Sequence, residues 1–446
     1  MEIVIKLSQF LLSLSLLIVL HELGHFIPAK LFKTRVEKFY LFFDVKFSLF
    51  KKKIGETVYG IGWLPLGGYV KIAGMIDESM DTEQMKQEPQ PWEFRSKTAW
   101  QRLIIMLGGV IVNFILAFII YIGVVWYYGE LDIKNSELRD GVWVTNPILE
   151  EAGLKNGDKI ISVNGKEIKS AYELNKKVTL GNQIVVERNG EEKTITPPVN
   201  FIGKIVDGDR MLNVTMRVPF VVTGVLEEST NAKTVQPNDI ITEFDNQKIT
   251  YADQLLGIVE NYKEQTVTAK VLRKEKEETI ELHINNEGKL GIGYASLLPA
   301  SNIEKLGLYK VDRNKYSFGE SIPVGINKGF NEISSYWNQL KKIVNPKTEA
   351  YKGLSGFFGI YNIFPNIWVW EIFWDITAIL SIMLGIMNLL PIPALDGGHV
   401  MFLLYEMITK RKPSEKFMEK AQIAGFFILI ALLLFANGND IFRAFK

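Results

Sequence analysis

Cysteine is absent from the 446 residues, histidine occurs only four times, and neither sign of charge dominates, with 51 basic residues against 50 acidic ones. The lack of cysteine excludes disulfides, thiolate metal ligands, iron–sulfur clusters and cysteine nucleophiles. The lack of a net positive charge argues against nonspecific binding of nucleic acid. Apolar residues are plentiful at 47%, although 23% of the residues are charged. This mixture indicates membrane spans joined to soluble domains, and the length predicts two to four domains.

Four segments are apolar enough to cross a membrane, whose hydrocarbon core takes about 20 helical residues. They cover residues 7–27, 103–128, 372–390 and 421–436. Basic residues crowd the loops that follow the first and third segments, so both loops are expected on the cytoplasmic side. Four spans then place both termini and the long segment 129–371 on the outer side.

The long outer segment contains an internal repeat. Residues 158–168 align without gaps on residues 239–249, each as a strand that enters a tight turn. Asn246 replaces the turn glycine Gly165 and tolerates the same left-handed backbone. Both copies resemble PDZ-type domains, which can bind an extended chain end by strand addition. The alternative is a pair of small β-rich domains that only obstruct access to the membrane.

The sequence His21-Glu-Leu-Gly-His25 lies inside the first apolar segment. Two histidines four residues apart share one helix face and can bind one zinc ion, while Glu22 between them can act as a general base. Charged and polar groups are costly at this depth, so their clustering indicates a functional site. The alternative is a polar cluster that only joins helices through hydrogen bonds.

A catalytic zinc site needs a third protein ligand and an open position for water. Asp375, Asp396 and His399 are the candidates near membrane depth. The first and third segments run in the same direction, from the outer to the cytoplasmic side. Asp396 therefore falls near the cytoplasmic end, where the histidines lie, whereas Asp375 lies near the outer end of the third segment. Asp396 is therefore the expected ligand, and His399 is the alternative. Pro391 and Pro393 precede both and prevent a regular helix.

These motifs together resemble the site-2 protease family of zinc metalloproteases (family M50), and within it the bacterial proteases that regulate sigma-E. The resemblance covers nearly the whole chain: the His-Glu-Leu-Gly-His motif, Gly109-Val-Ile-Val-Asn113, the two PDZ-type domains and residues 388–399. It implies that His21, His25 and Asp396 bind Zn²⁺ and that the glutamate Glu22 is the catalytic base. It also implies that Asn388 holds the substrate, with Pro391 and Pro393 shaping the site. Two departures are the missing turn glycines of the second PDZ-type copy and Phe357, where the family usually has proline.

The expected fold is a multi-pass α-helical membrane protein with four transmembrane helices, two tandem extracytoplasmic PDZ-like α+β domains and a membrane-associated β-hairpin. Its parts in chain order are the first span (1–30), a cytoplasmic β loop (31–99), the second span (100–128), PDZ-like domains (129–210 and 211–296), interfacial helices and linker (297–371), the third span with its Leu-Asp-Gly motif (372–400), and a cytoplasmic loop with the fourth span (401–446).

Two elements of this fold are predicted by residue pattern. Residues 58–72 combine β-favouring residues with glycines and an interrupting Pro65, which predicts a hairpin-like element against the membrane. In the family such an element pairs with the substrate strand; the alternative is an interfacial anchor. Residues 322–340 have apolar side chains at helical spacing, which predicts an interfacial helix, or one that packs against the PDZ-type domains.

The expected function is that of a zinc-dependent intramembrane endopeptidase of the bacterial cytoplasmic membrane. Its partners are the lipid bilayer and single-span membrane proteins such as anti-sigma factors or remnant signal peptides, and no nucleic acid. One alternative is a catalytically inactive scaffold that binds partners through its PDZ-type domains, against which the intact Glu22 argues. A metal transporter would need several acidic residues along a membrane path, and the sequence has only one such cluster.

Overall fold

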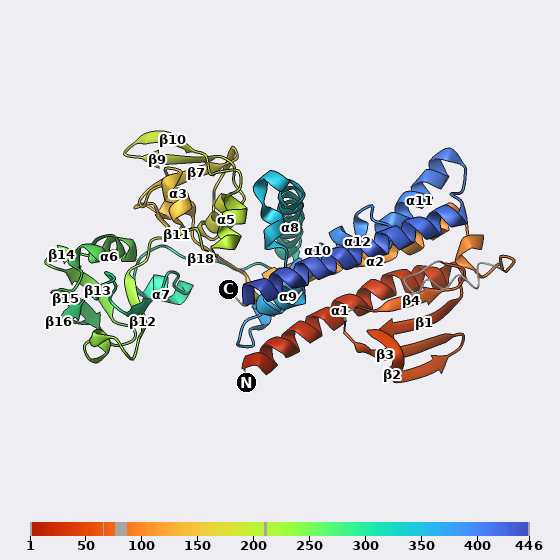
Figure 1. Ribbon diagram of the computed structural model, residues 1–446, viewed down its shortest axis with the longest axis horizontal. Helices are drawn as coiled ribbons and strands as arrows, with labels where there is room; N and C mark the ends of the chain where they lie inside the picture. Colours follow the sequence, from red (N-terminus) through yellow and green to blue (C-terminus); the bar gives the residue numbers. More distant parts are fainter. Residues whose placement is uncertain (1, 66, 76–86, 209–211, 445–446) are drawn as a thin grey trace. The chain divides into compact units, whose positions relative to one another are not determined.

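The computed structural model describes residues 2–65, 67–75, 87–208 and 212–444. The chain divides into two compact units (Figure 1). Unit 1 comprises Met1–Gly129, Lys315–Leu340 and Leu354–Lys446, and unit 2 comprises Glu130–Asn314 and Lys341–Gly353. The apolar helices belong to unit 1, and the repeated segment belongs to unit 2.

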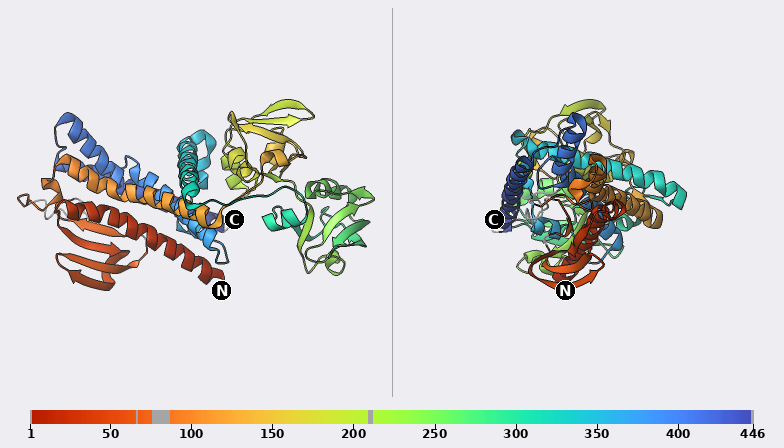
Figure 2. Two further views of the ribbon diagram at one scale, coloured as in Figure 1. Left: turned by 180° about the vertical axis from the view of Figure 1, so that it is seen from behind. Right: turned by 90° about the vertical axis from the view of Figure 1, so that its right-hand side faces the viewer.

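Among the described residues, four helices of unit 1 are long and apolar enough to cross a membrane. They are α1 (Glu2–Leu31), α2 (Ala99–Tyr128), α10 (Trp370–Leu389) and α12 (Glu415–Ala444). These helices agree with the four predicted segments. The helices α1, α2 and α12 extend well beyond the predicted segments, because helical hydrogen bonding continues through the polar residues beside the apolar runs. The helices α1, α2 and α10 contact one another and run side by side (Figure 2).

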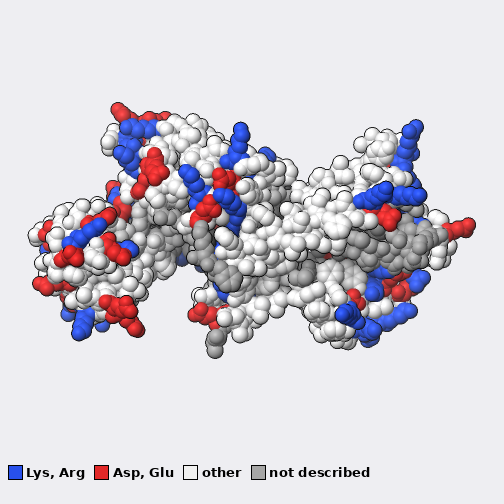
Figure 3. Space-filling view, viewed as in Figure 1, with Lys and Arg blue, Asp and Glu red and all other residues white. Residues whose placement is uncertain are grey.

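Charged side chains are sparse along the length of these helices. In Figure 3 they gather at the end of unit 1 that carries α11 (Asp396–Thr409) and the strands β1 to β4. Helix sides without charge suit a hydrocarbon environment, and basic residues at one end suit a cytoplasmic membrane face. The orientation of the chain in the membrane stays a prediction.

Glycines bring α1 and α2 into backbone contact. A Cβ atom on Gly108 would lie 1.9 Å from the carbonyl oxygen of Gly24, and a Cβ on Gly24 would lie 2.4 Å from the carbonyl oxygen of Gly108. No side chain larger than hydrogen fits at either position, and small residues at such crossings let membrane helices pack closely. Gly24 stands between His21 and His25, so the crossing lies at the predicted metal motif.

The region between α1 and α2 forms a four-stranded sheet. Its strands are β1 (Val36–Leu41), β2 (Phe43–Ile54), β3 (Thr57–Leu64) and β4 (Tyr69–Ile72), in the order β2-β3-β1-β4. The prediction of a hairpin over 58–72 was wrong in its pairing, because β1 lies between β3 and β4. The chain crosses from β3 to β4 through Pro65 and the glycines Gly67 and Gly68 instead of turning back on itself. As a result β4 is an edge strand.

The predicted interfacial helix lies within α8 (Phe318–Val344). Cβ atoms on Gly325 and Gly329 would collide with Ile122 and Phe118, so α8 packs closely on α2. Lys328 forms an ion pair with Asp375 of α10, at 2.9 Å. The short helix α9 (Phe357–Asn362) follows and contacts α1 and α12.

Unit 2 contains two modules with the same order of elements, which confirms the internal repeat. The first module consists of β7 (Lys159–Val163), β8 (Lys166–Glu167), α4 (Leu174–Thr179), β9 (Ile184–Arg188) and β10 (Glu191–Ile195). The second consists of β13 (Ile240–Phe244), β14 (Gln247–Lys248), α6 (Ala252–Val259), β15 (Thr266–Arg273) and β16 (Lys276–His283). Both sheets pair their strands in corresponding order. Their PDZ identity stays a prediction.

The repeat extends to individual side chains. Arg188 donates to the buried Asp158 at 2.6 Å, and Arg273 donates to the buried Asp239 at the same distance. The turn after each first strand uses left-handed residues in both copies, and Asn246 has a φ of 60° where Gly165 has 72°. Asparagine therefore keeps the turn that glycine forms in the first copy, as predicted.

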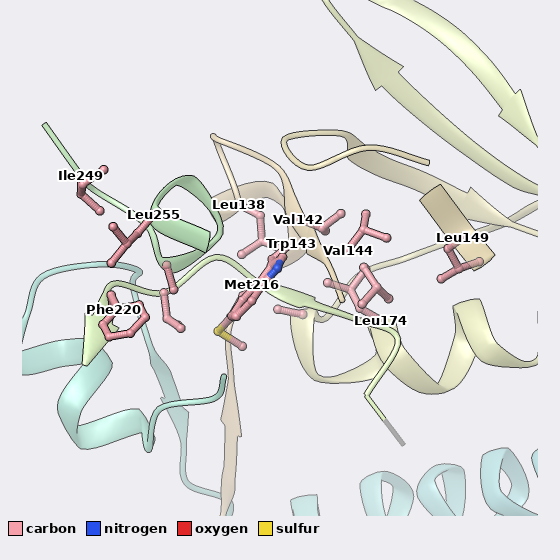
Figure 4. Close-up of a cluster of buried hydrophobic side chains, with 14 of the residues drawn as sticks. Leu138, Val142, Trp143, Val144, Leu149, Leu174, Met216, Phe220, Ile249 and Leu255 are labelled. Atoms are coloured by element: carbon pink, nitrogen blue, oxygen red, sulfur yellow. The ribbon is translucent and has the colours of Figure 1, made fainter. Parts of the chain in front are cut away.

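One apolar core runs through both modules. Figure 4 shows part of it, with Leu174 from the first module, Leu255 from the second, and Trp143 and Phe220 from two further strands of unit 2. The remaining elements of unit 2 are β5 (Glu130–Asp132), β6 (Val142–Val144), α3 (Pro147–Glu151), α5 (Phe201–Asp207), β11 (Val214–Met216), β12 (Phe220–Val225), β17 (Ile292–Tyr294), α7 (Ala300–Lys305) and β18 (Asp312–Asn314). Because β5 pairs with β18, the points at which the chain enters and leaves the two modules lie side by side.

Candidate metal centre

Helix α1 presents His21 and His25 on one face, as expected for residues one turn apart. Their Nε2 atoms lie 3.3 Å apart, and both residues are buried. The Nδ1 atom of His25 lies 2.8 Å from the carbonyl oxygen of Ile105 on α2. A carbonyl only accepts hydrogen bonds, so Nδ1 carries the hydrogen and the Nε2 lone pair of His25 is available to a metal.

Helix α2 approaches the histidines at a glycine. A Cβ atom on Gly109 would lie 2.4 Å from Nε2 of His25 and 2.6 Å from Cε1 of His21. The missing side chain is what leaves room for both imidazole rings. Gly109 of the Gly109-to-Asn113 motif thus leaves space for the histidines. One turn later on α2, the Nδ2 atom of Asn113 lies 3.0 Å from Nδ1 of His21.

Asp396 joins the two histidines from the start of α11. Its Oδ2 atom lies 3.4 Å from Nε2 of His21 and 3.3 Å from Nε2 of His25. An irregular segment, 390–395, separates α10 from α11, and Ala394 within it has a φ of 78°. A Cβ on Gly397 would lie 2.2 Å from the carbonyl oxygen of Leu390, so the tight approach that turns the chain into α11 requires glycine there.

The three atoms fit a tetrahedral zinc ion. Their separations of 3.3, 3.4 and 3.3 Å form a nearly equilateral triangle. Tetrahedral zinc with bonds of about 2.0–2.1 Å separates its ligand atoms by about 3.3–3.4 Å. The Oδ2 atom of Asp396 is buried and has no hydrogen-bond partner in the described part of the chain, which is costly unless a cation binds it. Among the described residues, His21, His25 and Asp396 form the one group of three side chains able to hold a metal ion.

The two other ligand candidates from the sequence have different partners. Asp375 pairs with Lys328, and His399 lies with its Nε2 3.3 Å from Nε2 of Gln422 on α12. Neither belongs to the ligand group. The structure therefore places Asp396, and neither of the other two candidates, against both histidines, while its role as a metal ligand stays a prediction.

A cavity of about 340 Å³ opens at the three ligands. Glu22, Asn388 and His399 line it, and the Nδ2 atom of Asn388 lies 3.3 Å from Nε2 of His21. Residues of the edge strand β4, Tyr69 to Ile72, form another part of the wall. Pro391 and Pro393 are not among the described residues that line the cavity, and they lie in the irregular loop before Asp396. The cavity therefore combines the three candidate metal ligands, the Glu22 carboxylate and a sheet edge.

Comparison with known proteins decides the family. A model of peptidase family M50 matches residues 9–432. The chain belongs to peptidase family M50. This confirms the resemblance to site-2 proteases, and the chain is a zinc metalloprotease of that family.

Relatives of similar length share this assignment. A protein of Rickettsia conorii named "Putative zinc metalloprotease" is 27% identical, with 99% of this chain and 100% of the relative covered. A protein of the same name from Campylobacter jejuni is 28% identical, over 98% of this chain and 94% of the relative. A third, from Fusobacterium nucleatum, is 28% identical over 97% of both chains. The M50 peptidase thus aligns with these relatives from end to end.

Sequence reasoning missed the steric role of the glycines around the M50 centre. Gly24, Gly108 and Gly109 act through contacts between α1 and α2, which are distant in sequence. A pair of adjacent glycines in an apolar helix was the available signal, because glycine is otherwise unfavourable in a helix interior. The contact between Asn113 and His21 had a similar signal, a buried amide inside the most apolar span.

Proposed function

We propose that this M50 peptidase is an intramembrane endopeptidase that cuts the transmembrane segments of single-span membrane proteins. The observation that carries the proposal is the triangle of His21, His25 and Asp396 in one cavity with Glu22. The histidines belong to a helix that is long and apolar enough to cross a membrane. A hydrolytic site on such a helix suits substrates that themselves lie in the bilayer.

The proposed roles follow from the chemistry of each side chain. His21, His25 and Asp396 would hold the zinc ion, which when bound polarises the scissile carbonyl and makes water more acidic. The Glu22 carboxylate accepts a proton from the attacking water and delivers it to the nitrogen of the departing amine. The Asn388 amide, which lines the same cavity, is a hydrogen-bond partner for the substrate backbone.

The sheet edge gives the substrate a way to become extended. A helical substrate hides its carbonyl groups in internal hydrogen bonds, so the scissile region must unwind before hydrolysis. In the part of the chain that the structure describes, strand β4 pairs with the single strand β1, and its residues line the cavity. We infer that an unwound substrate segment adds to β4 as a further strand, which replaces the hydrogen bonds that its helix loses.

The proposed setting is the bacterial cytoplasmic membrane. The basic loops would face the cytoplasm, while both termini and the two modules of unit 2, as PDZ-like domains, would face outward. Anti-sigma factors and remnant signal peptides are the proposed substrates, since both present a single membrane segment. In this arrangement the modules act on the admission of substrates.

The position of the cut tests the proposal. Purified enzyme in bilayer vesicles would be mixed with a single-span substrate, and the product ends would be mapped by mass spectrometry. We expect the cut bond to lie inside the apolar segment, with cleavage lost after zinc chelation and restored by zinc. A cut confined to the soluble flanks would contradict the intramembrane assignment, and zinc binding without any cleavage would favour an inactive scaffold.

A further inference from the structure

Asn113 contacts the metal centre from its rear side. Its Nδ2 atom lies 3.0 Å from Nδ1 of His21, on the far side of the imidazole ring from the ligand atom Nε2. Asn113 is completely buried in the most apolar of the four helices, and its Oδ1 atom has no hydrogen-bond partner among the residues that the structure describes. A buried amide oxygen without a partner is costly, so its position calls for a function.

Metal binding at Nε2 of His21 requires a hydrogen-bond acceptor at its Nδ1 atom. A neutral histidine that gives its Nε2 lone pair to a metal carries its hydrogen on Nδ1 and needs an acceptor there. His25 has such an acceptor, the carbonyl oxygen of Ile105 at 2.8 Å. For His21 the corresponding neighbour is the Asn113 amide nitrogen, which is a donor, and two donors do not bond.

A half-turn of the Asn113 amide resolves the conflict. The oxygen and nitrogen of a carboxamide have nearly the same shape, so a rotation of 180° exchanges their places within the same space. The partnerless Oδ1 would then face Nδ1 of His21 and accept its hydrogen. The Asn113 backbone need not move, and the hydroxyl of Ser381 on α10 donates to its carbonyl oxygen at 2.8 Å.

We propose that Asn113 is a positioning residue of the metal centre, whose Oδ1 accepts the Nδ1 hydrogen of His21 when a metal occupies Nε2. The inference rests on the proposed zinc site.

Metal affinity tests the assignment without reference to cleavage. The full-length protein would be stripped of metal, and its affinity for Zn²⁺ and Co²⁺ measured by competition with a chromophoric chelator. Asn113→Leu keeps the size but removes the acceptor, and should weaken binding by about 10- to 100-fold, the usual effect of losing such a partner. Asn113→Asp keeps an acceptor and should bind at least as tightly as the wild type.

A matched control is available in the same bundle. Ser13 lies on α1 two turns before His21 and is as buried as Asn113. Its hydroxyl bonds to that of Thr377 on α10, at 2.9 Å. Ser13→Ala should leave metal affinity within about twofold. Unchanged affinity in Asn113→Leu would overturn the assignment. Equal weakening in Asn113→Asp and Asn113→Leu would overturn it as well, because the aspartate retains the acceptor.

A second measurement stands even if Asn113→Leu does not fold. The ¹⁵N resonances of the four histidines in the zinc-loaded wild type should show two rings with metal at Nε2 and hydrogen at Nδ1. A metal-bound ring without hydrogen at Nδ1 would refute the proposal. Binding of one zinc per wild-type chain would still support the proposed metal centre, so failure of the Asn113 assignment and failure of the zinc site are distinguishable.

Discussion

Gly109→Ala should disable the metal centre with a single methyl group. The added Cβ would lie 2.4 Å from Nε2 of His25, and ordinary contact begins at 3.4 Å, so the ring must retreat by about 1.0 Å (3.4 − 2.4). Metal sites tolerate departures of only about 0.2 Å in ligand distance. His25 has little freedom to retreat, because its Nδ1 is held by the carbonyl oxygen of Ile105.

The size of the effect follows from the strain. Overpacking by one methyl group costs about 1–3 kcal/mol. If that strain falls on the zinc-bound state, zinc affinity should fall by roughly 5- to 150-fold, at about 1.4 kcal/mol for each factor of ten. Cleavage at saturating zinc should fall by about 10²-fold, the effect of displacing a reacting group by about 1 Å.

Gly123→Ala is the matched control on the same helix. A Cβ at Gly123 would meet nothing within 4 Å, so alanine there should leave zinc affinity and cleavage unchanged and slightly favour the helix. Both variants would be compared by chelator competition and by cleavage of one single-span substrate. Wild-type zinc affinity in Gly109→Ala, or an equal loss in Gly123→Ala, would refute the steric reasoning.

Two further predictions concern the third ligand and the outer modules. Asp396→Ala should lose zinc and cleavage together, whereas His399→Ala should keep zinc and part of the activity, since only Asp396 belongs to the ligand group. Metal analysis of both variants checks this prediction, and equal loss of zinc in the two would contradict it. Residues 135–295 can be replaced by a short linker, because β5 and β18 lie on either side of the deletion and pair with each other. The deletion variant should bind zinc, cleave short-tailed substrates and also cleave substrates with bulky outer domains. Loss of cleavage of every substrate by a folded, zinc-loaded deletion variant would refute a gating role.

The parts of the fold that depend on local pattern could be predicted from the sequence. The four apolar helices follow from composition, and the facing histidines follow from a spacing of four residues on one helix. The paired modules follow from an alignment in which Asp158 matches Asp239 and Gly165 matches Asn246. Asp396 could be chosen over Asp375 because the direction of a span fixes which of its ends meets the histidines.

The parts that depend on contacts between distant segments could not be predicted. The insertion of β1 between β3 and β4 is a choice of pairing among strands with similar propensities, so the pattern at 58–72 favoured a hairpin. The close approach at Gly24, Gly108 and Gly109 becomes visible only when both helices are in place. The same is true of the contact between the Asn113 amide and His21, because the two residues are 92 positions apart in the sequence.

Glu22→Gln tests the central claim most directly, because it separates metal binding from chemistry. Glutamine has the size of glutamate and lines the same cavity, but it does not accept the proton from water. The account predicts one zinc per chain in both proteins, with cleavage in the variant reduced by about 10²–10⁴-fold or more. Glu371→Gln, at the start of α10 and outside the cavity, should match the wild type in both measurements. Wild-type cleavage by zinc-loaded Glu22→Gln would contradict the account.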